Sequence, residues 1–178
     1  SDLGNIEAVA HVKVKALPKA PDNVVTSEVT ATSVKLTWSS GNVDPIQSYT
    51  ITYKPNFAQG SEHPSIPNIM NPEYTVTGLS AYTRYEFRVI AVNNIGQGEP
   101  SNPVDVTTGE LAPGSPPQNV RAQPVSSSTV VVQWEEPRIP NGMIKGYKVY
   151  YTPTPDIPIS LWTIHNVDNS RLTTISNL

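Results

Sequence analysis

The sequence predicts an all-β chain that folds as two β-sandwiches in tandem. Three observations support this fold class: the composition favours strands, one pattern of residues occurs twice, and apolar residues alternate with polar ones within each copy. Of the 178 residues, 18 are proline and only 15% are charged, whereas average usage is about 5% proline and about 25% charged. Amphipathic helices need many Glu, Lys, Ala and Leu residues, so this composition favours short strands joined by turns.

Three segments of the first half recur in the second half at nearly constant spacing. The pairs are Thr32–Trp38 with Ser128–Trp134, Ser48–Tyr53 with Gly146–Tyr151, and Tyr74–Leu79 with Leu172–Leu178. Their ends are offset by 96, 98 and 99 residues. A repeat of roughly 100 residues has the size of a seven-stranded sandwich, so the chain holds two copies of one module.

In the first module, apolar side chains recur at every second residue, as at Val34, Leu36 and Trp38 and again from Tyr85 to Ala91. This spacing places one set of side chains on one face of a half-buried strand. Turn-forming residues interrupt the runs, and Gly96-Gln97-Gly98 is the expected turn between the last two strands. The module should run from about Pro21 to Thr108, with strands near 23–27, 33–39, 46–54, 57–61, 74–77, 83–93 and 101–108.

The segment 109–117 contains three prolines and is expected to be a semi-rigid linker. The second module begins near Gln118, with strands expected near 118–124, 129–134, 144–151, 161–165 and 171–176. Its pattern stops at Leu178, which corresponds to Leu79 of the first module. We therefore expect the second module to lack its last two strands within this sequence, which leaves a sheet edge open.

Several classes of function are excluded by composition. The net charge of −3 does not provide the basic surface that nucleic acid requires. The chain has no cysteine, which excludes disulfides, thiolate metal sites and a cysteine nucleophile. No run of about 20 apolar residues is present, so the sequence contains no membrane-spanning helix, and no signal peptide is visible.

The residues at the ends of these strands resemble a known family. Trp38 closes the second strand, Leu79 precedes Tyr85 by six residues, and the segment Tyr85–Gly96 follows. This combination resembles the fibronectin type III (FN3) signature, an immunoglobulin-like sandwich with a buried tryptophan and a tyrosine corner at Tyr85. The residues expected in the two cores are Trp38, Leu79, Tyr85, Trp134, Tyr147 and Leu178.

A narrower resemblance covers nearly the whole chain. The segments Val14–Pro21, Thr30–Trp38, Phe87–Gly96 and Pro140–Thr152 resemble the first two FN3 repeats of LAR-type (leukocyte common antigen-related) receptor protein tyrosine phosphatases. The resemblance implies the following domains: residues 1–17 as the last strand of a third immunoglobulin domain or an N-terminal extension, 18–109 as FN3 module 1, 110–117 as a Pro-rich linker and 118–178 as FN3 module 2.

The resemblance also implies a function. The segment would serve adhesion, recognition and spacing on the extracellular side of the cell membrane, in a single-pass type I receptor phosphatase that acts in axon guidance and synapse organisation. Its partners would be cell-surface adhesion proteins, such as leucine-rich-repeat synaptic proteins. Heparan sulfate would bind only through upstream domains absent from this sequence, and no direct membrane contact is implied.

The segment itself is expected to have no catalytic, metal or cofactor-binding residue. Phosphatases of this family use a cysteine thiolate as nucleophile, so the catalytic domains of the parent must lie elsewhere. His11, His63 and His165 lie in three separate stretches and are expected on the surface. Lys13 with Lys15, and Lys145 with Lys148, are too few to form a groove for a polyanion.

Four residues are candidate contacts for a protein partner: Ile90, Val92, Tyr150 and Trp162. Tyr150 should point away from the core if Tyr147 and Tyr151 point inward. Exposed aromatic and aliphatic side chains can anchor an interface, but single apolar surface residues are also common. For Trp162, packing across the sheet edge is the alternative.

Two other readings of the whole chain stay open at this stage. One is a purely structural FN3 array in a cytosolic protein or in another cell-adhesion protein, since the absence of cysteine fits either compartment. The other is an FN3 spacer attached to a secreted enzyme.

Overall fold

The structure is a computed structural model that describes residues 4–10, 14–60 and 63–178. The chain divides into two compact units, one made of residues 1–28, 34–76 and 84–106, the other of residues 29–33, 77–83 and 107–178. His11, Lys13 and part of the expected immunoglobulin strand lie outside the described residues. The described parts of that segment, 4–10 and 14–17, form no strand.

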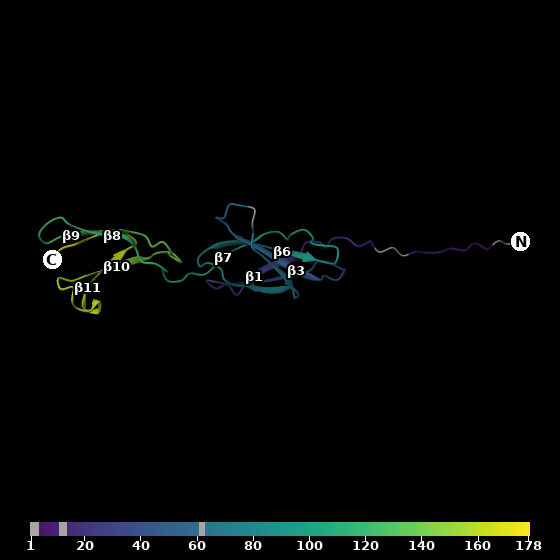
Figure 1. The fold of residues 1–178 in the computed structure, drawn as a ribbon, viewed down its shortest axis with the longest axis horizontal. Coiled ribbons are helices and arrows are strands. Elements are labelled where there is room, and N and C mark those ends of the chain that lie inside the picture. The colour runs from purple at the N-terminus through teal and green to yellow at the C-terminus, as the bar shows by residue number, and fades with distance from the viewer. Residues whose placement is uncertain (1–3, 11–13, 61–62) are drawn as a thin grey trace. The chain divides into compact units, whose positions relative to one another are not determined.

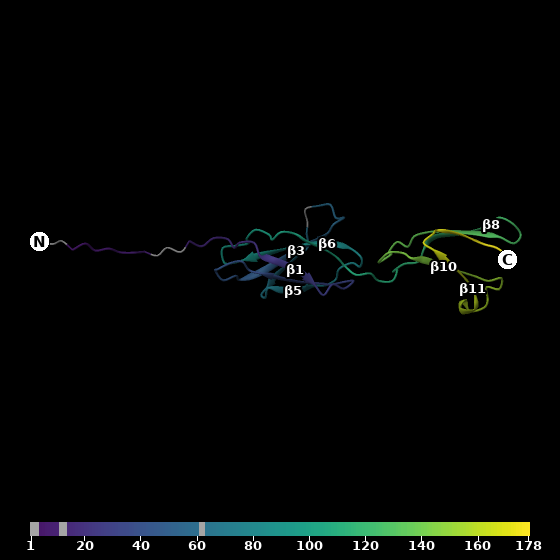
Figure 2. The same ribbon diagram turned by 180° about the vertical axis from the view of Figure 1, so that it is seen from behind.

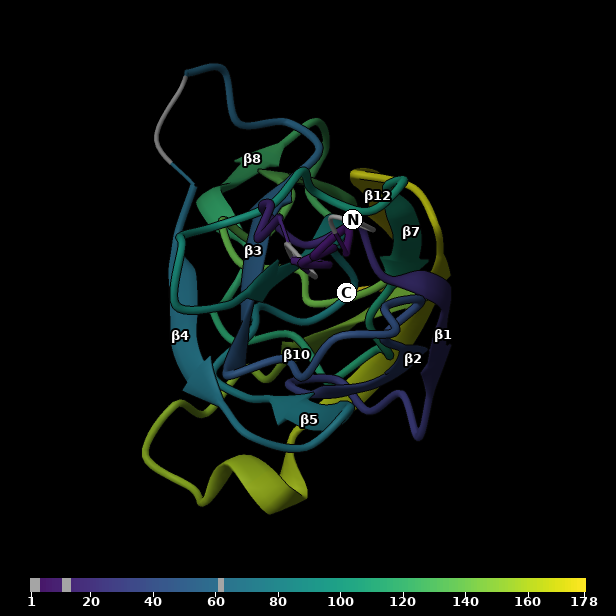
Figure 3. The same ribbon diagram turned by 90° about the vertical axis from the view of Figure 1, so that its right-hand side faces the viewer.

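The strands of the first module form two antiparallel sheets (Figure 1). One sheet has the order β1-β2-β5 and the other the order β4-β3-β6-β7, with β1 and β2 side by side in Figure 3. Their bounds are β1 Asp22–Ser27, β2 Val34–Ser39, β3 Ser48–Pro55, β4 Ser65–Ile69, β5 Glu73–Val76, β6 Arg84–Val92 and β7 Val104–Thr107. The strands and their pairing show the expected all-β sandwich.

The core of the first module follows the alternation of the sequence. Along β2, Val34, Leu36 and Trp38 are buried while the residues between them are half-buried. Phe87 and Val89 of β6 are fully buried. The period of two places these side chains between the two sheets. Burial of each Val, Leu or Phe side chain there contributes about 1.5–3 kcal/mol to stability.

The second module also has two layers, with β8 apart from β10 and β11 (Figures 1 and 2). One sheet has the order β8-β9-β12, and the other pairs β10 with β11. The bounds are β8 Gln118–Pro124, β9 Val130–Glu135, β10 Gly146–Tyr151, β11 Thr163–Asp168 and β12 Leu172–Ile175, with one 3₁₀ turn at Ile159–Leu161. Val132, Trp134 and Ile175 form its core, against which Tyr147 and Val149 pack.

The fourth strand lies later in the chain than the sequence analysis predicted. Residues 57–60 of the expected strand 57–61 form a turn and loop, and Ala58 N–H donates to the Pro55 carbonyl at 3.0 Å. The observed strand, β4, contains Pro67 and occupies the edge of its sheet. Proline cannot donate to a ladder and is tolerated at an edge, so Pro67 does not prevent this segment from forming a strand.

Candidate functional site

Four of the six residues predicted for the cores are buried, and Tyr147 is half-buried and packs against the second core. Trp38, Leu79, Tyr85 and Trp134 are only 5–7% exposed. The ring of Trp38 meets that of Tyr49 edge to face at 5.3 Å between centroids, and Trp134 meets Tyr147 in the same way at 5.2 Å. Edge-to-face pairs at such distances are favourable. Each module therefore contains its own Trp–Tyr pair of the same kind in its core.

Leu178 is the exception, because its side chain is 55% exposed. Its main chain occupies the position expected from the repeat: Leu178 N–H donates to the Ser128 carbonyl, just as Leu79 N–H donates to the Thr32 carbonyl, both at 3.0 Å. Leu79 is followed by a loop and by β6, whereas Leu178 is the last residue of the sequence. Among the described residues no strand equivalent to β6 packs over Leu178, and it is therefore not a core residue in this structure.

Of the candidate partner contacts, Ile90 is covered and does not form an exposed anchor. Ile90 is 9% exposed, and its cross-strand partner Thr50 is 5% exposed. Val92 is half-buried and bridges to Gln97, because the loop after β6 folds back over the end of the strand. The alternation of apolar residues correctly predicted the side of the sheet on which Ile90 lies, but it could not show that this side is covered there.

Tyr150 lies on the outer face of β10, with 41% of its side chain exposed. It lies directly opposite Ile164 of β11, which is 48% exposed. At the equivalent ladder position of the first module, Thr52 lies opposite Ser65. The second module therefore presents an apolar cross-strand pair where the first presents a polar one.

Trp162 closes the loop that joins β10 to β11. Its indole N–H donates to the Ile157 carbonyl at 3.0 Å, and the side chain is half-buried. The adjacent 3₁₀ turn instead exposes Ile159 and Leu161, by 62% and 68%. These two residues and Ile164 were not among the predicted contacts. No 3₁₀ turn was expected before the strand 161–165, and the sequence did not show which residue of the neighbouring strand lies opposite Ile164.

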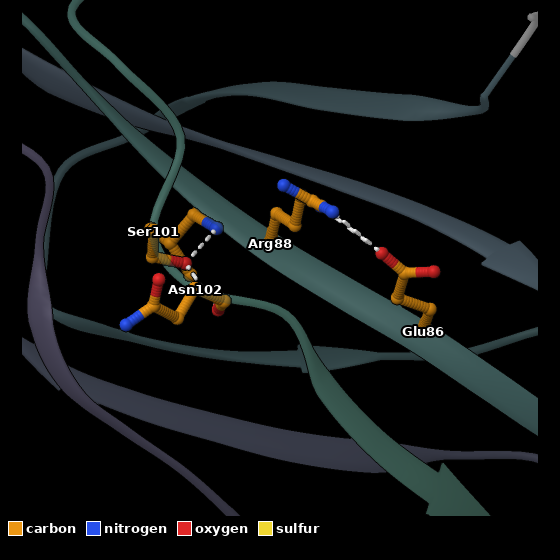
Figure 4. Close-up of polar contacts among 5 residues, drawn as sticks. Glu86, Arg88, Ser101 and Asn102 are labelled. Carbon is orange, nitrogen blue, oxygen red and sulfur yellow. Dashed lines mark hydrogen bonds and ion pairs between the residues drawn. The ribbon is translucent and has the colours of Figure 1, made fainter.

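The polar side chains on β6 and beside it are structural (Figure 4). Arg88 pairs with Glu86 at 3.0 Å on one strand, and Arg84 reaches Asp105 at 2.9 Å. The hydroxyl of Ser101, a residue only 2% exposed, accepts the N–H of Val89 at 2.9 Å. The contacts of Arg84 with Asp105 and of Val89 with Ser101 join β6 to the chain that follows it, and the Arg88–Glu86 pair lies within β6.

No cluster of metal-binding side chains occurs among the described residues. They contain no group of three or more His, Asp or Glu side chains that could hold a metal ion. His63 is exposed, but His165 is half-buried, with its Nε2 2.9 Å from the Thr173 hydroxyl. His165 is therefore not the surface residue that was expected: it lies on the inward-facing side of β11. Within the same described ranges, no helix has the length and apolarity to cross a membrane.

Comparisons with known proteins agree with this architecture. The model of the fibronectin type III domain matches residues 19–107 and 115–178. Among solved structures, the FN1–FN3 domains of chicken CNTN1 superpose with a TM-score of 0.69 at 27% identity, over 90% of this chain and 56% of that chain.

Three similar proteins illustrate the relatives of the chain. Receptor-type tyrosine-protein phosphatase F of Danio rerio is 53% identical and receptor-type tyrosine-protein phosphatase S of Gallus gallus is 52% identical. Tyrosine-protein phosphatase Lar of Drosophila melanogaster is 51% identical. Each match covers 100% of this chain but only 9%, 12% and 9% of the respective relative. The chain thus spans about a tenth of the length of these relatives.

Proposed function

The chain belongs to the fibronectin type III family and is similar along its whole length to LAR-type receptor tyrosine phosphatases, and from this premise we propose that it is an extracellular segment of such a receptor. The observation that carries the proposal is identity of 51–53% over all 178 residues to three receptor-type or Lar phosphatases. In this role the segment supplies no chemistry. The phosphatase activity belongs to domains elsewhere in the parent, since the chain has no cysteine to act as nucleophile.

The proposed mechanism is geometric. Each sandwich is held by a buried tryptophan and a layer of apolar side chains, so it behaves as a stiff block. Tandem blocks extend the receptor from the cell surface and position its other domains. Engagement or clustering of the extracellular part then determines where the phosphatase acts, which is the proposed link to axon guidance and synapse organisation.

The second part of the proposal is recognition of a cell-surface adhesion protein, such as a leucine-rich-repeat synaptic protein. Tyr150 and Ile164 form the exposed apolar pair that supports it. Tyrosine is enriched among residues that dominate interface energies. Lys148 lies two residues from Tyr150 on the same strand face and is exposed, and it would favour an acidic rim on the partner.

A cell-surface binding assay tests the recognition role. The whole chain is applied to cells that each display one adhesion protein, and the bound chain is quantified. We expect saturable binding to at least one leucine-rich-repeat protein and a loss of about tenfold or more in affinity for Tyr150→Ala. The matched control is Thr52→Ala, at the equivalent position of the first module. If no displayed protein binds the chain above background, the segment is a spacer without recognition.

A further inference from the structure

The segment that precedes the first strand of each module is bound by an asparagine of that module. In both modules this asparagine lies in the loop between the second and third strands. In the first module, Asn42 Oδ1 accepts the N–H of Lys19 at 2.8 Å, and Asn42 Nδ2 donates to the Lys19 carbonyl at 3.1 Å. In the second, the Asn141 carbonyl accepts the N–H of Leu111 at 2.8 Å, and Asn141 Nδ2 donates to the Ala112 carbonyl at 3.1 Å. An asparagine of this loop therefore binds the entering chain in both modules, through its side chain alone in the first and through its main chain and side chain in the second.

Additional hydrogen bonds hold the entering chain of the first module. Asn93, in the loop after β6, donates from Nδ2 to the Ala16 carbonyl at 2.8 Å. Its Oδ1 accepts the N–H groups of Ile95 and Gly96, at 2.9 and 3.2 Å. One half-buried side chain therefore both shapes its own loop and holds residues that lie 77 positions earlier.

The entering chain of the second module is held at both of its ends. Gly114 N–H donates to the Ile139 carbonyl at 2.8 Å, and Ile139 N–H donates to the Ser115 hydroxyl at 2.9 Å. At the other end, the Glu110 carboxylate accepts the N–H of Met143 at 2.7 Å. The segment 110–115 is therefore hydrogen-bonded along its length to the loop that contains Asn141.

Glycines permit the close approach in both modules. A methyl group on Gly98 would overlap the carbonyl of Pro18. A methyl group on Gly114 would lie 2.9 Å from Asn141 Nδ2, and one on Gly142 would lie 2.9 Å from Glu110 Oε1. Contacts at such distances require the neighbouring atoms to move. At each of these three glycines, the entering chain and the loop of its module are therefore closely packed.

We propose that residues 14–19 and 110–115 are straps, each fastened to the module it enters by a clasp residue, Asn42 or Asn141. Proline restricts only φ and would leave a spacer semi-rigid, whereas the hydrogen bonds make each strap part of its module. The module then sets the direction in which the chain enters it. This inference does not depend on the proposed function, because it concerns the order of two segments and no partner.

NMR relaxation on the whole chain tests the straps. We expect backbone order parameters of about 0.85 for residues 110–115, the value of a rigid backbone. Asn141→Asp should lower them toward about 0.6 beside Ala112, where the Nδ2 bond is lost, and less at the ends of the segment, where the other bonds remain. Aspartate keeps the size of the side chain but lacks the Nδ2 donor. The matched control is Asn166→Asp, which makes the same charge change on the exposed face of β11, where the Asn166 side chain has no hydrogen bond in the structure as described. Asn42→Asp should loosen residues 14–19 and leave 110–115 unchanged.

Two results would overturn the proposal. One is an order parameter below about 0.6 for residues 110–115 in the unaltered chain. The other is an equal response to Asn141→Asp and Asn166→Asp. If Asn141→Asp unfolds the second module, which circular dichroism would show, Glu110→Ala decides instead. This exposed substitution removes the acceptor of the Met143 N–H and should speed hydrogen exchange at Met143, and an unchanged exchange rate there contradicts the strap.

Discussion

Removing the hydroxyl of Ser101 should destabilise the first module more than its small size implies. The hydroxyl accepts the N–H of Val89 at 2.9 Å and donates to the Asn102 carbonyl at 3.1 Å (Figure 4). Val89 is 0% exposed and Ser101 only 2%. In Ser101→Ala the N–H of the buried Val89 loses this acceptor.

The magnitude follows from the cost of an unsatisfied buried donor, about 1–3 kcal/mol. The bond from Ser101 N–H to the Val89 carbonyl, at 2.8 Å, stays in place and holds the local backbone. For a domain of 60–100 residues, each kcal/mol lowers the melting temperature by roughly 4–8 °C. The expected fall is therefore roughly 4–24 °C for the first module.

Urea unfolding of the whole chain, followed by NMR at residues of the first module, measures this free energy of unfolding. The matched control is Ser65→Ala, an exposed serine on β4 whose side chain makes no hydrogen bond among the described residues. We expect a change within about 0.5 kcal/mol for this control. Faster hydrogen exchange at Val89 should accompany the loss in Ser101→Ala. Equal free energies of unfolding for the two variants would refute the reasoning.

Three further predictions concern packing. Phe87→Ala should cost about 3–5 kcal/mol of unfolding free energy in a urea titration, whereas Phe57→Ala, at a side chain 78% exposed, should stay within about 0.5 kcal/mol; similar losses would contradict the described core. Leu79→Ala should cost about 2–5 kcal/mol of unfolding free energy and Leu178→Ala less than about 0.5 kcal/mol, as thermal unfolding of the two variants would show. Equal losses would mean that the equivalent position in the repeat, and not the burial of the side chain, sets the cost. Gly98→Ala should shift the NMR signals of residues 16–19, because the added methyl group meets the Pro18 carbonyl; unchanged signals there would show that this contact is absent.

Local patterns in the sequence predicted those strands whose side chains alternate. Along β2 and β6 the alternation reflects burial between the two sheets. The period of two therefore predicted both the strands and their buried faces. The failure at 57–61 had a different cause. The observed β4 contains a proline, and only its place at the edge of the sheet makes that proline acceptable.

The sequence could predict the face of the sheet on which a side chain lies, but not whether other segments cover that face. The alternation correctly directed Tyr150 outward and Tyr147 inward. It also put Ile90 on the outer face, yet Ile90 is 9% exposed. His165 was expected on the surface and lies half-buried, beside Thr173. Exposure depends on which other segments pass over a strand, and strand periodicity has no information on them.

The sequence by itself determined the all-β class, the two repeated modules and, apart from Leu178, the residues of their cores, because alternation and repetition are local properties of the chain. Only the tertiary structure decided which outward side chains stay exposed and how the entering segments are held. The bonds of Asn42 to Lys19 and of Asn93 to Ala16 join residues 23 and 77 positions apart. Such contacts form when folding brings distant loops together, so no pattern within either segment records them.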